Sequence, residues 1–184
     1  MTVTTRHAKS ASATKSAKAS CSHSPPANPN EAITQLTEDH ARVKKLFRQY
    51  EKLARDEAGE AERQELAHKI CVELTAHSTA EEDIFYPAAR DVLGQDADLV
   101  DEAEVEHGTA KELISQIRNS SPDDPHYDAK VKVLGEYIDH HVAEEEGKMF
   151  PKVRKAKLDT DMLGEQIAAR KAAVMEEAGA PVSQ

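Results

Sequence analysis

The sequence predicts an all-α protein, an up-down-up-down four-helix bundle with a disordered N-terminal arm and a short C-terminal fifth helix. Three observations support this prediction. The 184-residue chain has only seven glycines and no tryptophan, and it is rich in Ala, Glu, Lys and Leu, which favour helices. Apolar side chains recur every three or four residues in four long stretches. A short pattern of histidines and acidic residues also occurs twice. The length suits one ordinary domain.

The first 30 residues form a separate basic segment. They contain four Lys or Arg residues, no acidic residue and almost no large apolar side chain. Burial therefore cannot offset the entropy cost of ordering them, and we expect a disordered, solvated arm. An organellar transit peptide, or a weak anchor to nucleic acid or to an anionic surface, is the alternative. The bundle is then expected over residues 31–155, with a C-terminal helix and tail over 156–184.

The first two helices are predicted from apolar periodicity and from the residues that break it. The first runs from Ile33 to Leu53 and ends before Gly59. The second begins near Leu66 and is expected to end at Pro87 or soon after. Gly94 marks the turn that follows it.

The remaining helices follow the same reasoning. The third covers 99–117, after an N-cap at Asp96 or Asp98, and a segment rich in Ser, Asp and Pro ends it. The fourth begins near 131 and ends near Pro151. A short fifth helix is expected to start at Asp159 or Asp161, with apolar residues on one face.

Charge and composition restrict the class of protein. Residues 31–184 carry 20 basic and 34 acidic side chains, and this net charge of −14 disfavours nucleic-acid binding by the body of the protein. No run of eighteen apolar residues and no secretory signal occurs, so we expect no membrane partner. Two cysteines are too few for a disulfide framework. We expect a cytoplasmic protein, with organellar targeting by the arm left open.

The repeated pattern joins a histidine to a glutamate four residues later. His77-Ser-Thr-Ala-Glu81 recurs sixty-four residues later as His141-Val-Ala-Glu-Glu145, and each copy continues through a second acid and an aromatic residue to a proline. A further histidine precedes each copy, His40 by thirty-seven residues and His107 by thirty-four. Residues four apart lie on the same face of a helix, so each copy presents an imidazole and a carboxylate together.

These six side chains fall at positions that the apolar periodicity assigns to the core. Burying an imidazole or a carboxylate without a partner costs roughly several kcal/mol of folding free energy, and a bound cation offsets that cost. A buried hydrogen-bonded polar network is the alternative. The sequence therefore predicts a metal site with the following ligands: His40, His77, Glu81, His107, His141 and Glu145.

A competing pair on the fourth helix is His140 with Glu144. The face that contains this pair continues to Lys148, whereas the face of His141 continues to Met149 and keeps the alignment of the two copies. We therefore favour His141 and Glu145, and we expect His140 to be a supporting or surface residue. The other histidines have no predicted role: His68 is expected at the surface, and His7, His23 and His126 in the tail or a loop.

The ligand types narrow the choice of metal. Imidazole with carboxylate and no thiolate suits Fe, Mn or Zn rather than Mg or Ca. Six ligands favour two metals, one held by His40 and His77 and the other by His107 and His141. The two glutamates would then bridge the pair, as in other dimetal bundles.

The ordered spacing of these six residues in a four-helix bundle resembles the hemerythrin-like, HHE cation-binding domain family over about residues 31–155. The tail, with Leu163-Gly164 and Arg170-Lys171, is also similar to bacterial members. The resemblance implies two Fe ions bridged by the glutamates and an oxo or hydroxo group, with Mn or Zn as alternatives. It also implies oxygen or nitric oxide binding, oxygen or iron sensing, or reaction with peroxide.

One position departs from the family's oxygen carriers, which have a fifth histidine one turn after the third. Lys111 stands there in this chain. Both metals then keep an exchangeable position unless Glu82 or Glu104 fills it. Two such positions favour reaction with peroxide or another small oxidant over reversible oxygen storage.

The predicted function is the binding or sensing of O2, NO or H2O2 at a carboxylate-bridged di-iron pair. Two alternatives stay open: a catalase-like enzyme that disproportionates peroxide, and a metal-stabilised interaction module that acts through its arm or C-terminal helix. The sequence contains no nucleophile elbow, phosphate loop or Cys/His pair. It leaves open whether the protein is an enzyme and which protein partner it has.

Overall fold

The computed structural model describes residues 1–2, 28 and 31–179, so the predicted arm lies almost entirely outside the described residues. The described part is all-helical, which confirms the predicted fold class. Five long helices occur: α1 (Ala32–Arg55), α2 (Glu60–Ala80), α4 (Asp98–Arg118), α5 (Tyr127–Glu144) and α7 (Thr160–Gly179). The shorter segments are η1 (Glu81–Phe85), α3 (Tyr86–Leu93), η2 (Gly94–Asp96), η3 (Glu145–Met149) and α6 (Phe150–Ala156).

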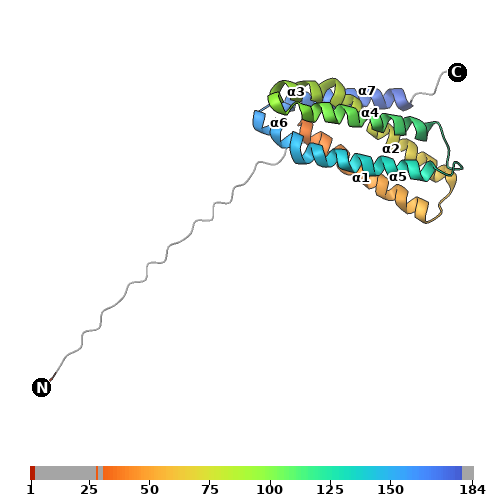
Figure 1. Cartoon of the computed structure of the whole chain (residues 1–184), viewed down its shortest axis with the longest axis horizontal. Coiled ribbons are helices and arrows are strands. Elements are labelled where there is room, and N and C mark those ends of the chain that lie inside the picture. Colours follow the sequence, from red (N-terminus) through yellow and green to blue (C-terminus); the bar gives the residue numbers. More distant parts are fainter. Residues whose placement is uncertain (3–27, 29–30, 180–184) are drawn as a thin grey trace.

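The helices α1, α2, α4 and α5 run up, down, up and down. Figure 1 shows the α1–α2 and α4–α5 connections at one end of the bundle, with α3 and α6 at the other end. Glu31 is the N-cap of α1: its side chain accepts a hydrogen bond of 2.9 Å from the backbone N–H of Thr34. The same carboxylate lies 3.1 Å from a guanidinium nitrogen of Arg154, which ties the start of α1 to α6.

The second predicted helix ends at Leu93, directly before the predicted turn at Gly94, whereas the fourth extends further than expected. Each changes to a single π-helical turn, η1 or η3, and then continues as α-helix to Leu93 or Ala156. Pro87 and Pro151 lie in the first turn of α3 and α6, where the missing N–H is tolerated. The prediction that the fourth helix ends near Pro151 was therefore wrong. The π-helical turn accommodates the proline without ending the helix.

The core consists of two apolar clusters separated along the bundle axis. The first lies toward the α1–α2 connection and includes Val43 and Leu74. The second lies toward α3 and α6 and includes Leu36 and Ala80. His40 and the other three predicted histidines are buried between these clusters. The metal-site candidates thus form one polar layer, which we call the histidine layer: His40, His77, Glu81, His107, His141 and Glu145.

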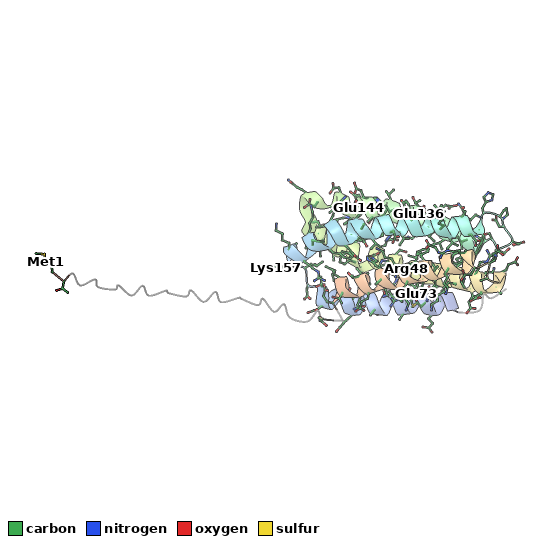
Figure 2. The ribbon with its side chains drawn as sticks, turned by 90° about the horizontal axis from the view of Figure 1, so that it is seen from below. Met1, Arg48, Glu73, Glu136, Glu144 and Lys157 are labelled. Atoms are coloured by element: carbon green, nitrogen blue, oxygen red, sulfur yellow. The ribbon has the colours of Figure 1, made fainter. Side chains whose placement is uncertain are left out.

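Helix α7 packs along α1, α2 and η1, with Leu163 and Ile167 buried in the second cluster. In Figure 2 it lies along the lower edge beside α1, whereas α5, with the labelled Glu136 and Glu144, lies along the upper edge. The helix begins at Thr160, between the two predicted starts, and its 20 residues make it longer than the short helix expected. None of the described helices is both long enough and apolar enough to cross a membrane.

Candidate metal centre

The histidine layer brings together all six residues that the sequence singled out. Each is buried, and Glu81 has no exposed surface. Their ligand atoms form two overlapping sets, each within 4.8 Å: His40, His77, Glu81 and Glu145 in one, and Glu81, His107 and His141 in the other. Their role as metal ligands stays a prediction, and the geometry of the layer bears on it directly.

The four histidines approach each other as two pairs. Nε2 of His40 lies 3.1 Å from Nε2 of His77, and Nε2 of His107 lies 3.2 Å from Nε2 of His141. At most one nitrogen of each pair can donate a hydrogen to the other. These pairs are the ones that the repeat suggested for two separate metals.

Glu81 spans the two histidine pairs. Its Oε2 atom lies 3.0 Å from Nε2 of His77 and 3.5 Å from Nε2 of His107. Despite these short distances, neither oxygen of Glu81 has a hydrogen-bond partner within the described part of the chain. A buried carboxylate without donors is costly, and a cation beside it removes that cost.

Glu145 has the corresponding position on the opposite side of the layer. Its Oε2 atom lies 3.2 Å from Nε2 of His40 and 3.5 Å from Nε2 of His141. Its Oε1 atom accepts a hydrogen bond of 2.9 Å from the hydroxyl of Tyr86, which also lies 3.2 Å from Nε2 of His107. Each glutamate therefore contacts one histidine from each pair.

An outer ring of carboxylates holds the other ring nitrogen of each histidine. The Nδ1-to-oxygen distances are 3.3 Å for His77–Asp39, 2.9 Å for His107–Glu82, 2.7 Å for His141–Glu106 and 2.8 Å for His40–Glu146. A carboxylate only accepts, so each Nδ1 carries the hydrogen and the lone pair of Nε2 faces the layer. This is the tautomer that binds a metal through Nε2, with the outer carboxylate fixing the ring.

The electrostatics of the layer favour bound cations. Burial lowers the pKa of His77, but the charge of Glu81 and the hydrogen bond to Asp39 outweigh it and raise that pKa to about 10. Burial raises the pKa of Glu145, yet contact with His40 and the charges of nearby histidines lower it to about 2. In the absence of metal, the layer therefore stabilises positive charge on His77, and a metal would replace its second proton.

The donor set fits a pair of transition-metal ions. Four Nε2 atoms and two buried carboxylates converge without a thiolate, a combination that suits Fe, Mn or Zn. The unsatisfied oxygens of Glu81 and Glu145 are the observation that calls for cations here.

The competing residues lie outside the layer. The side chain of His140 is 65% exposed and lies 3.7 Å from Glu106, while Glu144 forms an ion pair with Lys148. His68 is exposed, as expected, and His126 is exposed near Asp124. His7 and His23 lie outside the described residues.

Neither carboxylate considered for an open metal position reaches the layer. Glu82 contacts Nδ1 of His107 and the ammonium of Lys111, at 2.9 and 2.7 Å. Glu104 forms an ion pair of 3.2 Å with Arg90 at the surface. The Glu82–Lys111 contact also occupies the side chain at the position where a fifth histidine would stand.

Sequence reasoning missed Tyr86. In the repeat alignment Tyr86 corresponds to Phe150, so the position seemed to require only an aromatic ring. The rings do have similar places: Phe150 stacks on His40 with centroids 5.9 Å apart, and Tyr86 packs against His107 at 5.3 Å. Only the hydroxyl distinguishes them. Of the outer carboxylates, Glu82 was considered only as a possible metal ligand, and Asp39, Glu106 and Glu146 were missed, although each follows a layer glutamate or precedes a layer histidine in the repeat.

A small cavity of about 20 Å³ adjoins the four histidines on the side of the first apolar cluster. Apolar side chains form much of its wall, among them Val43, Leu74, Ala110, Ile114 and Ile138. This volume is close to that of a single water molecule. A larger groove of about 660 Å³ lies between α1 and α5 but contains none of the six layer residues.

The comparisons with known proteins agree with this geometry. The family model described as the hemerythrin HHE cation-binding domain matches residues 31–153. A crystal structure of a hemerythrin HHE cation-binding domain-containing protein from Mycobacterium kansasii superposes with a TM-score of 0.65 and 26% identity, covering 80% of this chain and 88% of that one.

A curated protein described as a DNA nickase, from Nostoc sp. (strain PCC 7120), is 34% identical over 93 residues. The match covers 50% of this chain, which spans only about a quarter of that relative. The family model, by contrast, covers most of this chain and includes the whole histidine layer. The chain belongs to the hemerythrin HHE cation-binding domain family.

Proposed function

We propose that this protein holds two iron ions in the histidine layer and binds or senses a small diatomic ligand or oxidant there. The observation that carries the proposal is the position of the two buried glutamates. Glu81 and Glu145 each contact one histidine of both pairs, as a carboxylate bridging two ions would require. The outer ring adds support, because it orients four Nε2 atoms toward the layer.

Iron is the metal we propose, since a pair of iron ions, when bound, supplies both redox chemistry and Lewis acidity. His40 and His77 would hold one ion, and His107 and His141 the other. The chain's own contribution is to fix these ligands, to keep their Nδ1 atoms protonated and to surround the pair with apolar side chains.

The cavity beside the histidines supports a very small ligand. At about 20 Å³ it suits a molecule of two heavy atoms rather than an organic substrate. Its wall contains Val43, Leu74 and Ile114, which favour an uncharged ligand such as O2, NO or H2O2. Lys111 and Ser78 supply polar groups at its edge.

Metal analysis combined with optical spectroscopy tests the proposal. Protein loaded anaerobically with Fe(II) is expected to hold close to two irons per chain and to gain near-ultraviolet absorption on exposure to O2 or H2O2. The matched control replaces His140 with Ala, which removes a histidine outside the layer. Protein that stays colourless and free of iron after loading would contradict the proposal.

A catalase-like activity is the second candidate, and Tyr86 favours it. Burial and the charge of Glu145 raise the pKa of this phenol well above its usual value, so the hydroxyl keeps its proton. It donates its hydrogen to Glu145 and lies 3.2 Å from Nε2 of His107, so an oxidant bound in the layer would lie close to this hydroxyl. An oxygen electrode would detect O2 release after peroxide addition. Release no greater than that of free-iron controls would favour binding or sensing instead.

Two further roles are less well supported. An interaction module that uses the metal only for stability would show no spectral response to O2, NO or peroxide, and the same spectra test it. DNA nicking, the activity in the name of the Nostoc relative, does not carry over to this chain. That match covers only a quarter of the relative, and the net charge of −14 over residues 31–184 repels a polyanion.

A further inference from the structure

The outer ring of carboxylates follows the internal repeat. Sixty-seven residues separate Asp39 from Glu106, as they separate His40 from His107. Asp39 contacts Nδ1 of His77, and Glu106 makes the equivalent contact with Nδ1 of His141. At these two carboxylates the two halves of the layer are thus built alike, but the side chains that surround the two carboxylates differ.

The surroundings of the two carboxylates differ sharply. The Asp39 side chain is 5% exposed and forms ion pairs with Arg42 and with Lys171 of α7. The Glu106 side chain is 18% exposed, and apart from His141 its ionic partner in the described chain is His140, at 3.7 Å. One carboxylate is therefore fixed by two cations, and its repeat equivalent is held mainly by the histidine it supports.

Helix α7, which packs on the α1–α2 half of the bundle, supplies one of the two cations beside Asp39, and Arg42 of α1 supplies the other. The Gln35 amide donates a hydrogen bond of 3.0 Å to the carbonyl of Gly164, and Arg170 lies 2.7 Å from Asp83 in η1. Lys171 of the same helix lies over Asp39, with 14% of the lysine side chain exposed. Figure 2 shows α7 beside α1 and on the opposite edge from α5.

The equivalent face of the second half is open. Leu99, Glu102, Ala103, Glu106 and Met149 line a recess of about 10 Å³ there, and the recess reaches Glu145. Glu102 and Ala103 are the repeat equivalents of Gln35 and Leu36, which lie on the α1 side that α7 covers. Helix α7 thus packs on the α1 and α2 side of the layer, whereas this recess borders α4 and η3.

We infer that Lys171 is a positioning residue that fixes His77 through Asp39, so that the metal of His40 and His77 is held tightly while the metal of His107 and His141 exchanges. The inference rests on the proposed function, because it presupposes two bound irons. The contact runs from Lys171 to Asp39 and from Asp39 to Nδ1 of His77. Losing an outer partner of a metal-bound histidine weakens metal binding roughly 10–100-fold.

The test is the kinetics of iron extraction by a chelator from anaerobically loaded, full-length protein. We expect two phases of equal amplitude in the unaltered protein. Lys171→Met is expected to speed the slow phase and to leave the fast phase unchanged. The increase should be less than the roughly 10–100-fold that loss of Asp39 itself would cause, because Arg42 stays beside that carboxylate. Lys171→Arg keeps the charge and should restore most of the slow phase. Arg170→Met is the matched control, since it removes the neighbouring α7 ion pair without touching Asp39.

Two further variants identify the halves. His141→Ala is expected to keep one iron with the slow rate, whereas His77→Ala should keep only iron that leaves fast. Release of both irons at a single rate would overturn the inference while leaving the proposed function intact. A slow phase that persists in His77→Ala would also overturn the inference. So would an equal change of the slow phase in Lys171→Met and Arg170→Met. Fewer than two irons after loading would instead contradict the proposed function on which it depends.

Discussion

The hydroxyl of Tyr86 donates a hydrogen bond of 2.9 Å to Oε1 of Glu145, which lies 59 residues further along the chain. This bond joins the two copies of the repeat across the histidine layer. It also breaks the symmetry between the glutamates, because Glu81 receives no equivalent bond from Phe150.

Replacing Tyr86 with Phe is expected to leave iron binding intact and to reduce reaction with peroxide. The ring still fills its place, so the loss of one hydrogen bond costs roughly 1 kcal/mol of folding stability. Glu145 loses its donor, and the bound oxidant loses a nearby hydroxyl. Iron-to-protein ratio, thermal melting and oxygen release together check this prediction. An unchanged rate of oxygen release would show that the hydroxyl has no part in the reaction.

Replacing either bridging glutamate with Ala is expected to release both irons. Glu81 and Glu145 each contact both histidine pairs, so either change removes a carboxylate from two metals at once. His40→Ala or His107→Ala takes a ligand from one metal only, and such variants should retain about one iron. Iron-to-protein ratios after identical loading measure the difference.

His140→Ala is the control for the register of α5, and it should keep close to two irons. Retention of iron by His141→Ala together with its loss from His140→Ala would place the ligand one residue earlier. Such a result would also undermine the alignment of the two copies.

Asp128 is expected to stabilise the end of the bundle that contains the α1–α2 and α4–α5 connections. This carboxylate accepts a hydrogen bond of 2.6 Å from the hydroxyl of Tyr50 and another of 2.6 Å from Arg63, joining α1, α2 and α5. Asp128→Ala leaves both donors without this partner and is expected to cost about 1–3 kcal/mol. Denaturant unfolding of metal-free protein measures the cost. Glu136→Ala, also on α5, is the surface control, and neither variant should change the iron content.

The cap of α1 predicts a pH dependence. Burial raises the pKa of Glu31, but bonds to Thr34 and Thr160 and the charge of Arg154 outweigh it, so that the folded pKa lies below 4.5. The ionised carboxylate therefore contributes stability that is fully present above the unfolded pKa and is lost as pH falls through the folded value. Metal-free Glu31→Gln protein is expected to be less stable than the unaltered protein at neutral pH. The difference should shrink below the usual pKa of a glutamate, and a constant difference down to strongly acid pH would contradict this explanation.

Much of the fold and the composition of the layer could be predicted from the sequence, because the helical period of the apolar residues indicates both the helices and the residues that face the core. His40, His77, His107 and His141 fall where apolar residues should, so the helical period placed them in the core. The turns at η1 and η3 could not be predicted, since one extra residue per turn leaves little trace in the period. Pro151 was consequently predicted to be the end of the fourth helix, whereas Gly94 gave the turn after the second.

The side of the bundle on which α7 packs could not be predicted from the sequence either. Its apolar face requires burial but does not specify which half of a repeated bundle it covers. The contact between Lys171 and Asp39 joins residues 132 apart. The repeated pattern identifies neither residue. A glutamate, Glu106, takes the place of Asp39 in the second copy, and Lys171 lies after the second copy.

The position of the histidine layer between two apolar clusters has a consequence for how the helices align along the bundle. An apolar core alone tolerates sliding, because one turn of Leu, Ile and Val resembles the next. A helix that slid by one turn, about 5.4 Å, would carry an imidazole into the cluster of Val43 and Leu74 or that of Leu36 and Ala80. Such a misplaced group would be buried without partners. The layer therefore favours one longitudinal alignment of α1, α2, α4 and α5 and destabilises alignments that are shifted by a helical turn.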